Sequence, residues 1–264
     1  MTLRRFRRAV ALGIEIFLCI VRFWLLRLKG PLTLERRAIW VQGCARRFLS
    51  SLNITYKVEG TPATRGLVVA NHLSYIDVLV LSAEMPCFFV AKIEIGGWPF
   101  FGRAARSGGT IFVNRRSLES AQSVAEQMKE RLVLPILVPV LLFPEGTSTD
   151  GSEVIRFHSR LIDPATSLGV PITPAAIRYT IHDGTPEREL CWYGDETFVN
   201  HLWKVLGVGG FEAEVRFGEP RVYTDRRIAA DTTHDEIVAM RNGAASMRDS
   251  SSSLAEPHHA EMRV

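Results

Sequence analysis

Hydrophobic and polar positions follow a distinctive pattern at the start of this chain. Residues 9–28 read AVALGIEIFLCIVRFWLLRL, an apolar stretch of nearly bilayer length that a few charged residues interrupt. Arg8, Glu15, Arg22 and Lys29 recur every seven residues, which on a helix gathers them in one narrow polar stripe with apolar residues elsewhere. The pattern predicts an N-terminal helix that lies at a membrane interface.

The free energy of insertion does not decide whether residues 9–28 cross a bilayer or lie on it. About twelve Leu, Ile, Val and Phe side chains each favour insertion by roughly 0.3 to 0.6 kcal/mol, whereas Glu15 and Arg22 each oppose it by roughly 2.5 to 3.5 kcal/mol. The sum is close to zero, so both arrangements stay open. A cleaved signal peptide is disfavoured because charges interrupt the apolar region and no small-residue cleavage site follows it.

A second amphipathic helix is predicted from Leu34 to about Leu52, after Gly30 and Pro31. Its apolar face consists of Leu34, Ala38, Val41, Ala45, Phe48 and Leu52. This face either adds to the membrane-binding surface or packs on the domain that follows. Residues 1–52 are therefore expected to form a membrane-associated helical region.

From residue 53 onward, short apolar runs alternate with helical stretches, which is typical of an α/β domain. The predicted strands are residues 56–59, 66–70, 87–91, 111–114, 136–143, 172–179 and 212–217. The predicted helices are about 75–83, 98–105, 117–132, 161–168, 197–206 and 233–246. We expect this domain to cover residues 53–242 and the polar residues 243–264 to form a disordered tail.

Positive charge is concentrated at the N-terminus. The chain carries a net charge of +4, but its first fifty residues hold ten Arg and Lys29 against only Glu15 and Glu35, a net +9. Because this basic segment is also the most apolar one, it favours contact with an anionic cytoplasmic leaflet over nucleic-acid binding. A composition of 47% hydrophobic and 23% charged residues excludes a disordered protein. Four scattered cysteines without CxxC spacing disfavour a zinc site and indicate a reducing compartment.

The predicted strand at residues 66–70 runs directly into the sequence NHLSYID. Five residues turn a helix through about 500°, so His72 and Asp77 cannot share a helical face, and His72 is expected in the turn before the helix. Asp77 can then reach back to one imidazole nitrogen and raise the basicity of the other, which suits removal of a proton from a substrate hydroxyl. On this spacing alone, a helix-capping His72 and a surface Asp77 remain the alternative.

Two further segments carry polar groups that suit substrate recognition. Glu145, Gly146 and Thr147 follow the buried run PILVPVLLFP and present a carboxylate, flexible backbone and a hydroxyl at a sheet edge. Arg115 and Arg116 follow the strand of GGTIFVN, and paired guanidinium groups suit bidentate capture of phosphate. An ordinary turn at Glu145 and a solvated arginine pair are the alternatives.

Together with the segment VPITP at residues 170–174, these blocks in this order resemble the lysophospholipid acyltransferase family typified by 1-acylglycerol-3-phosphate acyltransferase. The resemblance covers about residues 66–180, and NHLSYID with FPEGTS roughly seventy residues later is its specific part. It implies a single mixed-sheet α/β acyltransferase domain with N-terminal helices that sit on the bilayer. It also implies that His72 is the general base and Asp77 its orienting partner.

The resemblance implies roles for further residues. Arg115, Glu145, Gly146 and Thr147 would bind the headgroup of the acceptor, Lys92 would be a further phosphate contact, and Pro171 would lie near the acyl-binding side. Two departures from the family pattern concern the acceptor: Asn114 replaces the usual Asp of the second block, and RFHSR at residues 156–160 replaces a basic, aromatic, basic, small run ending in Gly. The sequence FPEGTSTDG followed by RFHSRL resembles bacterial members that acylate lyso-ornithine lipid or other lysolipids more closely than it resembles the phosphatidate-forming branch.

The implied reaction is acyl transfer from acyl-CoA or acyl-carrier protein to the free hydroxyl of a lysolipid. Lysophosphatidic acid, which would give phosphatidic acid for phospholipid biosynthesis, is the leading acceptor, and lyso-ornithine lipid is an alternative. His72 would take the hydroxyl proton and return it to the departing thiolate, so no metal, redox cofactor or acyl-enzyme is required. The expected location is the cytoplasmic face of the cell inner membrane.

Two other classes of protein stay open from the sequence. One is a catalytically silent lipid- or acyl-CoA-binding protein, which would have no need for a paired base. The other is a thioesterase or lipid hydrolase in which water replaces the acceptor. Under the acyltransferase hypothesis, His72→Ala and Asp77→Ala are both expected to abolish turnover and leave the fold intact.

Overall fold

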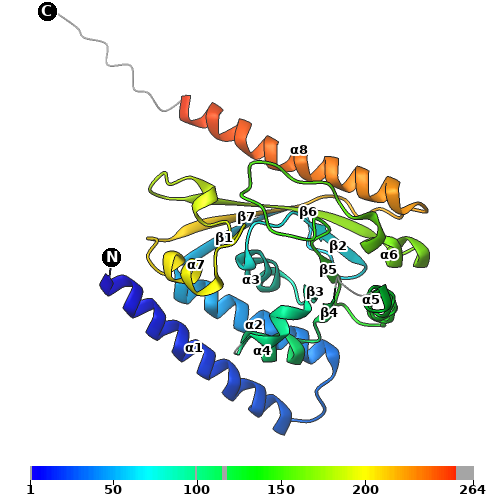
Figure 1. Cartoon of the computed structure of the whole chain (residues 1–264), viewed down its shortest axis with the longest axis horizontal. Helices are drawn as coiled ribbons and strands as arrows, with labels where there is room; N and C mark the ends of the chain where they lie inside the picture. Colours follow the sequence, from blue (N-terminus) through cyan, green and yellow to red (C-terminus); the bar gives the residue numbers. More distant parts are fainter. Residues whose placement is uncertain (1, 99, 115–117, 254–264) are drawn as a thin grey trace, which may run out of the picture.

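A mixed β-sheet forms the centre of the molecule (Figure 1). The structure, a computed structural model, describes residues 2–98, 100–114 and 118–253. Within these residues seven strands form one sheet in the order β1-β7-β6-β2-β5-β3-β4. The strands are β1 (Ile54–Glu59), β2 (Leu67–Ala70), β3 (Phe88–Lys92), β4 (Ile111–Val113), β5 (Val140–Leu142), β6 (Ile172–Ile181) and β7 (Phe211–Phe217). Five strands from β6 to β4 run parallel, while β7 and β1 run in the opposite direction. The predicted single mixed sheet is confirmed.

Helices cover both faces of the sheet (Figure 1). They are α1 (Thr2–Leu28), α2 (Leu34–Leu52), α3 (Tyr75–Glu84), α4 (Phe101–Gly108), α5 (Leu118–Leu132), α6 (Asp163–Leu168), α7 (Phe198–Val205) and α8 (Arg226–Ser253), with the short 3₁₀ helices η1 (Ile93–Gly97), η2 (Ser159–Leu161) and η3 (Glu187–Glu189). Alternate residues of β2 face opposite sides: Val68 and Ala70 pack with α2 and α3, whereas Leu67 and Val69 pack with α5, α6 and α8. A parallel strand covered on both faces is apolar throughout, as this one is.

The strand β5 is shorter than the pattern predicts. The sequence predicts a strand over residues 136–143, but β5 contains only Val140–Leu142. Proline has no N–H group to donate, so Pro139 gives the strand no ladder hydrogen bond through its nitrogen. Its carbonyl oxygen still accepts a hydrogen bond from the N–H of Phe88 (3.0 Å), which holds the approach to the strand in place.

The last helix is longer than the pattern predicts. The sequence predicts a helix over residues 233–246, but α8 begins at Arg226, because Asp225 Oδ1 accepts hydrogen bonds from the N–H groups of Arg227 (2.7 Å) and Ile228 (3.0 Å). The helix continues to Ser253, so part of the segment expected to be a disordered tail is helical. No proline interrupts that segment, so the backbone can continue the helix past Asn242. Residues 254–264 lie outside the described residues.

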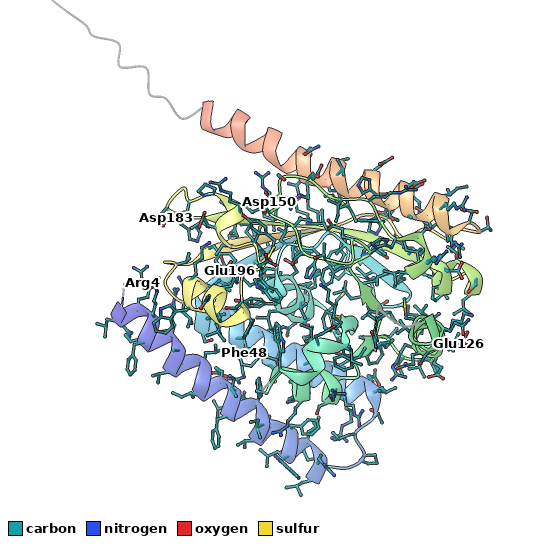
Figure 2. All side chains as sticks on the ribbon, in the orientation of Figure 1. Arg4, Phe48, Glu126, Asp150, Asp183 and Glu196 are labelled. Atoms are coloured by element: carbon teal, nitrogen blue, oxygen red, sulfur yellow. The ribbon has the colours of Figure 1, made fainter. Side chains whose placement is uncertain are left out.

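The helix α2 packs against the sheet domain. Four of the six residues on its predicted apolar face are buried: Ala38, Ala45, Phe48 and Leu52. Phe48, labelled in Figure 2, meets the rings of Phe100 and Phe101 edge-on at centroid distances of 6.2 and 6.5 Å. Of the two alternatives for this helix, packing on the following domain is confirmed.

The helix α1 lies along α2 (Figure 1), with one face against the domain and the other exposed. On the inner face, Leu12 is 8% exposed and Cys19 is fully buried, and the Trp40 indole donates a hydrogen bond to the Cys19 carbonyl oxygen (3.2 Å). The outer face exposes Leu3, Phe6, Val10, Ile14, Phe17, Ile20, Val21, Trp24, Leu25 and Leu28. Among the described residues, Leu3–Leu28 is the one helical segment long and apolar enough to cross a membrane.

Three residues of the predicted polar stripe, Arg8, Glu15 and Arg22, are turned toward the domain or α2, whereas Lys29 is exposed after the end of α1. Arg8 donates a hydrogen bond to the carbonyl oxygen of Gly209 (2.9 Å). Glu15 lies 3.7 Å from the guanidinium of Arg22 and 3.9 Å from that of Arg47 on α2. The Glu15 carboxylate therefore lies between two guanidinium groups of the protein, and the apolar outer face of α1 is the surface that meets the surroundings.

Candidate active site

The strand order brings the polar sequence motifs to one edge of the sheet. His72 follows β2, Glu145 follows β5, Lys92 ends β3 and Asn114 follows β4. These strands are parallel neighbours in the order β2-β5-β3-β4, so their carboxyl ends lie side by side. Ligand sites of parallel α/β sheets form at this edge. Arg115, the next residue after Asn114, lies outside the described residues.

His72 and Asp77 form a hydrogen-bonded pair at the end of β2. His72 lies in the turn before α3 and Asp77 in its first turn, as the spacing predicts, with 2.8 Å between His72 Nδ1 and Asp77 Oδ2. Asp77 is fully buried, whereas 19% of the His72 side chain is exposed. Because the Asp77 oxygens receive only donors, Nδ1 carries the proton of the neutral ring. Within the described part of the chain His72 Nε2 has no hydrogen-bond partner, so it can accept a proton from a substrate.

Asp77 is held by donors on both of its oxygens. Oδ2 also accepts hydrogen bonds from the N–H groups of Leu73 (2.7 Å) and Ser74 (3.0 Å), and Oδ1 accepts one from the hydroxyl of Tyr179. Burial, reinforced by the Asp77 charge, raises the pKa of Tyr179 well above its usual value, so the hydroxyl stays protonated as a donor. The sequence motifs did not identify Tyr179 as a site residue. The available signal was a tyrosine inside an apolar strand, because a buried tyrosine hydroxyl needs a hydrogen-bond partner.

The ring and backbone of His72 are fixed by their neighbours. The imidazole stacks on Phe143 with 4.1 Å between ring centroids and 16° between planes. The His72 carbonyl oxygen accepts a hydrogen bond from the N–H of Thr149 (2.9 Å). The side-chain amide of the preceding Asn71 accepts from the N–H of Ile177 (2.7 Å) and donates to its carbonyl oxygen (3.1 Å), which ties the end of β2 to β6. The imidazole of His72 is therefore held in one orientation by the protein itself.

Glu145 braces this turn from the neighbouring strand. Its Oε1 accepts a hydrogen bond from the N–H of His72 (2.6 Å) and its Oε2 accepts one from the N–H of Ile155 (3.1 Å), while the residue is 2% exposed. Burial raises the pKa of Glu145 to about 7, against the opposing effect of the two backbone donors. This placement differs from the expected contact with an acceptor headgroup, because both carboxylate oxygens are occupied by the protein backbone.

Three other predicted site residues lie on the same edge of the sheet. Gly146 adopts a positive φ of 75°, which glycine tolerates best, and its N–H donates to the carbonyl oxygen of Phe143 (3.0 Å). The resulting turn leaves Thr147 exposed. Lys92 is exposed at the end of β3. Both side chains are therefore accessible at the edge where His72 lies.

Pro171 lies at the opposite edge of the sheet. It precedes the first residue of β6, and its carbonyl oxygen accepts a hydrogen bond from the N–H of Leu67 (3.0 Å) at the amino end of β2. Leu67 and His72 are five residues apart on an extended segment, so at about 3.3 Å per residue the two edges are separated by roughly 16 Å. The structure does not bring Pro171 together with the other predicted residues. Pro171 precedes the amino end of β6, whereas His72 follows the carboxyl end of the neighbouring parallel strand β2.

Comparison with known proteins places this fold and this site in one family. A family model described as Acyltransferase matches residues 53–178, which contain both His72 and Glu145. The lyso-ornithine lipid O-acyltransferase of Rhodobacter capsulatus is 35% identical over 201 residues, which cover 73% of this chain and 71% of that protein. The chain belongs to the acyltransferase family. The 1-acyl-sn-glycerol-3-phosphate acyltransferase of Neisseria meningitidis is 31% identical to this acyltransferase over 177 residues, which cover 65% of this chain and 68% of that protein.

A solved structure supports the fold over nearly the whole acyltransferase chain. The crystal structure of the 1-acyl-sn-glycerophosphate acyltransferase PlsC from Thermotoga maritima matches with a TM-score of 0.67, covering 94% of this chain and 95% of that one at 18% identity. The match includes the N-terminal helices as well as the sheet, because so little of either chain is left uncovered. The family inferred from the sequence motifs is confirmed, and the protein is an acyltransferase enzyme.

Proposed function

We propose that this acyltransferase moves a fatty acyl group from a thioester, acyl-CoA or acyl-carrier protein, to the free hydroxyl of a lysolipid, with His72 as the general base. The observation that carries the proposal is the His72–Asp77 pair, in which Nδ1 is engaged at 2.8 Å and Nε2 is left for substrate. The acceptor hydroxyl gives its proton to Nε2 as its oxygen attacks the thioester carbonyl. The buried Asp77 carboxylate stabilises the imidazolium that forms.

The second half of the reaction uses the same proton. The new oxygen–carbon bond stays, the carbon–sulfur bond breaks, and Nε2 returns the proton to the departing thiolate. A direct transfer of this kind needs no nucleophile on the protein, which agrees with the burial of all four cysteines. Holding the two substrates in line at one edge of the sheet supplies much of the rate enhancement.

Lyso-ornithine lipid is the acceptor that the comparisons favour. The relative with that activity matches at 35% identity over 73% of this chain, against 31% over 65% for the relative that acylates 1-acyl-sn-glycerol 3-phosphate. This reverses the order of acceptors expected from the sequence motifs. Lysophosphatidic acid is the second candidate, supported by the second of these relatives.

A transfer assay on a panel of lysolipids tests the acceptor. Purified enzyme is incubated with labelled acyl-CoA and either lyso-ornithine lipid, lysophosphatidic acid or no acceptor, and the products are identified by mass. We expect O-acylated ornithine lipid as the main product, because the relative that acylates lyso-ornithine lipid is the more similar of the two. Free fatty acid at the same rate with and without acceptor would show a thioesterase, and no product of either kind would show a silent binding protein. Either result would overturn the proposal.

We propose that the enzyme sits on the cytoplasmic face of the cell inner membrane with α1 lying flat on the anionic surface. The helix is tied to the domain near both ends: Arg4, labelled in Figure 2, donates to the carbonyl oxygen of Gly207 (3.2 Å), and the carbonyl oxygen of Leu26 accepts from Arg36 (3.1 Å). A helix held along the domain in this way lies on a bilayer rather than crossing it. Its apolar outer face then enters the boundary between headgroups and acyl chains.

Polar substitution on the outer face of α1 is expected to release the enzyme from membranes. Phe17 and Trp24 are 63% and 58% exposed, and burial of each aromatic side chain in lipid contributes roughly 1.5 to 3 kcal/mol. The Phe17→Ser/Trp24→Ser variant should therefore bind anionic vesicles at least about tenfold more weakly in a sedimentation assay. Ile228→Ser on α8, where the side chain is 61% exposed, is the matched control and should bind as the wild type does. Equal vesicle binding by the α1 variant would contradict the proposed position.

A further inference from the structure

The loop after β5 surrounds a hollow beside the candidate active site. A cavity of about 460 Å³ is lined by five consecutive residues, 156–160, and we call it the RFHSR hollow. Phe157 anchors this loop: it is 4% exposed and meets the ring of His234 on α8 edge-on, with 5.2 Å between centroids. Arg156 and Arg160 are exposed on either side of this anchor. The hollow therefore presents cationic side chains on a loop that is held in place.

The two guanidinium groups of the RFHSR hollow differ from those arginines of the sheet domain that form ion pairs. Neither has an ion-pair partner in the part of the chain that the structure describes. Other arginines of the domain are paired with acidic side chains: Arg216 with Glu59, Arg221 with Glu236, Arg226 with Asp163, and Arg241 with Glu187. Two guanidinium groups that line one cavity without a counterion are suited to bind an oxyanion.

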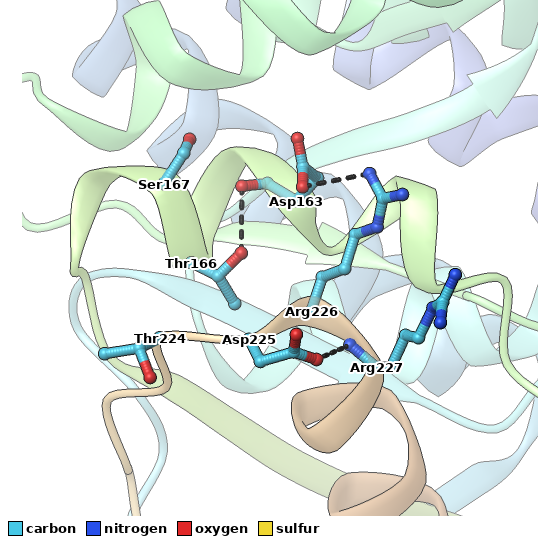
Figure 3. Close-up of a pocket in the computed structure, with 7 residues that line it drawn as sticks. All are labelled: Asp163, Thr166, Ser167, Thr224, Asp225, Arg226 and Arg227. Carbon is cyan, nitrogen blue, oxygen red and sulfur yellow. Dashed lines mark hydrogen bonds and ion pairs between the residues drawn. The ribbon is translucent and has the colours of Figure 1, made fainter.

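A second hollow has acidic as well as basic side chains on its wall (Figure 3). Its volume is about 380 Å³, and it lies between α6 and the start of α8, near the amino end of β6. Arg226 on its wall pairs with Asp163 (3.2 Å), and Asp225 accepts a hydrogen bond from the N–H of Arg227 (2.7 Å). The wall therefore carries two carboxylates beside its two guanidinium groups, and it is at the edge of the sheet away from His72.

Hydrogen bonds connect the RFHSR hollow directly to the base. Glu145 accepts from the N–H of His72 at 2.6 Å and from the N–H of Ile155 at 3.1 Å, so these two backbone nitrogens are at most about 8 Å apart across one carboxylate. His158 donates its N–H to the carbonyl oxygen of Pro144 (2.9 Å), which holds the loop against the same turn. Arg156, the next residue after Ile155, is therefore within side-chain reach of a substrate held at His72.

We propose that Arg156 and Arg160 bind the oxyanion of the acceptor headgroup, a phosphate or a carboxylate, while the acceptor hydroxyl lies at His72. The proposal rests on the proposed function. An acceptor has its anionic group only a few bonds from the reacting hydroxyl, which matches an anion site one loop away from the base. The phosphates of acyl-CoA are separated from the thioester by the long pantetheine arm, so a site this close to His72 fits the acceptor better than the donor.

Steady-state kinetics of arginine variants test this assignment. Arg156→Ala and Arg160→Ala are each expected to raise KM for the anionic acceptor about tenfold, and the double variant to raise it further, because charge-assisted hydrogen bonds are lost. Arg156→Lys keeps the charge but loses bidentate contact, so its KM should lie between those of wild type and Arg156→Ala. KM for acyl-CoA should stay unchanged in all of them. Arg227→Ala, on the wall of the second hollow, is the matched control and should leave both KM values unchanged.

Two outcomes would overturn the assignment. The first is an acceptor KM in the double variant within twofold of the wild-type value. The second is a rise in KM for acyl-CoA with an unchanged acceptor KM, which would assign the hollow to the donor phosphates. Equilibrium binding of short-chain lysophosphatidic acid without donor, compared between wild type and double variant, is independent of turnover. Weaker binding by the double variant would support the anion site even where the transfer assay had failed.

Discussion

We expect the His72→Ala variant to transfer acyl groups about 10³ to 10⁴ times more slowly than the wild type, with the loss in kcat. The imidazole is the group placed to take the acceptor proton, and its Nε2 is unoccupied within the described residues. The fold should persist, because 19% of this side chain is already exposed and its one side-chain hydrogen bond is to Asp77. Initial rates with saturating acyl-CoA and lysolipid, together with thermal unfolding of both proteins, measure the two effects separately.

A second histidine provides the control for this substitution. His182 is exposed at the surface, so His182→Ala should retain wild-type kcat and thermal stability. Transfer by His72→Ala at the wild-type rate would remove His72 from the mechanism and with it the proposed direct transfer.

We expect Asp77→Asn to lower kcat by about 10² to 10⁴ while the turn keeps its shape. The amide oxygen can still accept from the N–H groups of Leu73 and Ser74, and the amide nitrogen can donate to the Tyr179 oxygen, which switches from donor to acceptor. What is lost is the negative charge that orients Nδ1–H and stabilises the imidazolium. The measurement is kcat at saturating substrates, with circular dichroism to show that the fold is retained. A kcat within twofold of the wild-type value would mean that Asp77 has no part in the chemistry.

Two companion substitutions separate charge from position. Asp77→Ala would leave the N–H groups of Leu73 and Ser74 and the Tyr179 hydroxyl unsatisfied inside the protein, so it should reduce stability by about 3 kcal/mol or more, contrary to the intact fold expected from the sequence.

Tyr179→Phe removes one donor from the carboxylate. The carboxylate then lacks one of the groups that hold it in place, so kcat should fall several-fold while both KM values stay unchanged. A purely structural role for Tyr179 would lower the melting temperature and leave kcat at the wild-type value.

The sequence alone predicts the local elements that carry the chemistry. Each of the seven strands was predicted at its place in the chain, because short runs of apolar or alternating residues bounded by turn residues identify strands. The His72–Asp77 contact follows from spacing, since a turn residue and a residue in the first helical turn are necessarily close. The predicted bounds of β5 and α8 were less accurate. Pro139 and Asp225 each affect individual backbone hydrogen bonds, and the hydrophobic pattern contains no information about these bonds.

The arrangement of the site is decided by the tertiary structure. Only the strand order shows that Glu145 lies beside His72 and that Pro171 lies at the far edge, because adjacency in a sheet depends on pairing between distant segments. Only packing shows that Tyr179, 102 residues from Asp77 along the chain, donates to its carboxylate.

What the amino-acid sequence determined by itself is the His72–Asp77 pair, the α/β class and the apolar N-terminal helix, because each depends on patterns within a few residues. The fold alone decided that Arg8 and Glu15 of α1 are turned inward, and that Glu145 binds the backbone of both His72 and Ile155. These features depend on which distant groups share a small buried volume and satisfy one another's charges and hydrogen bonds, and no local pattern contains that information.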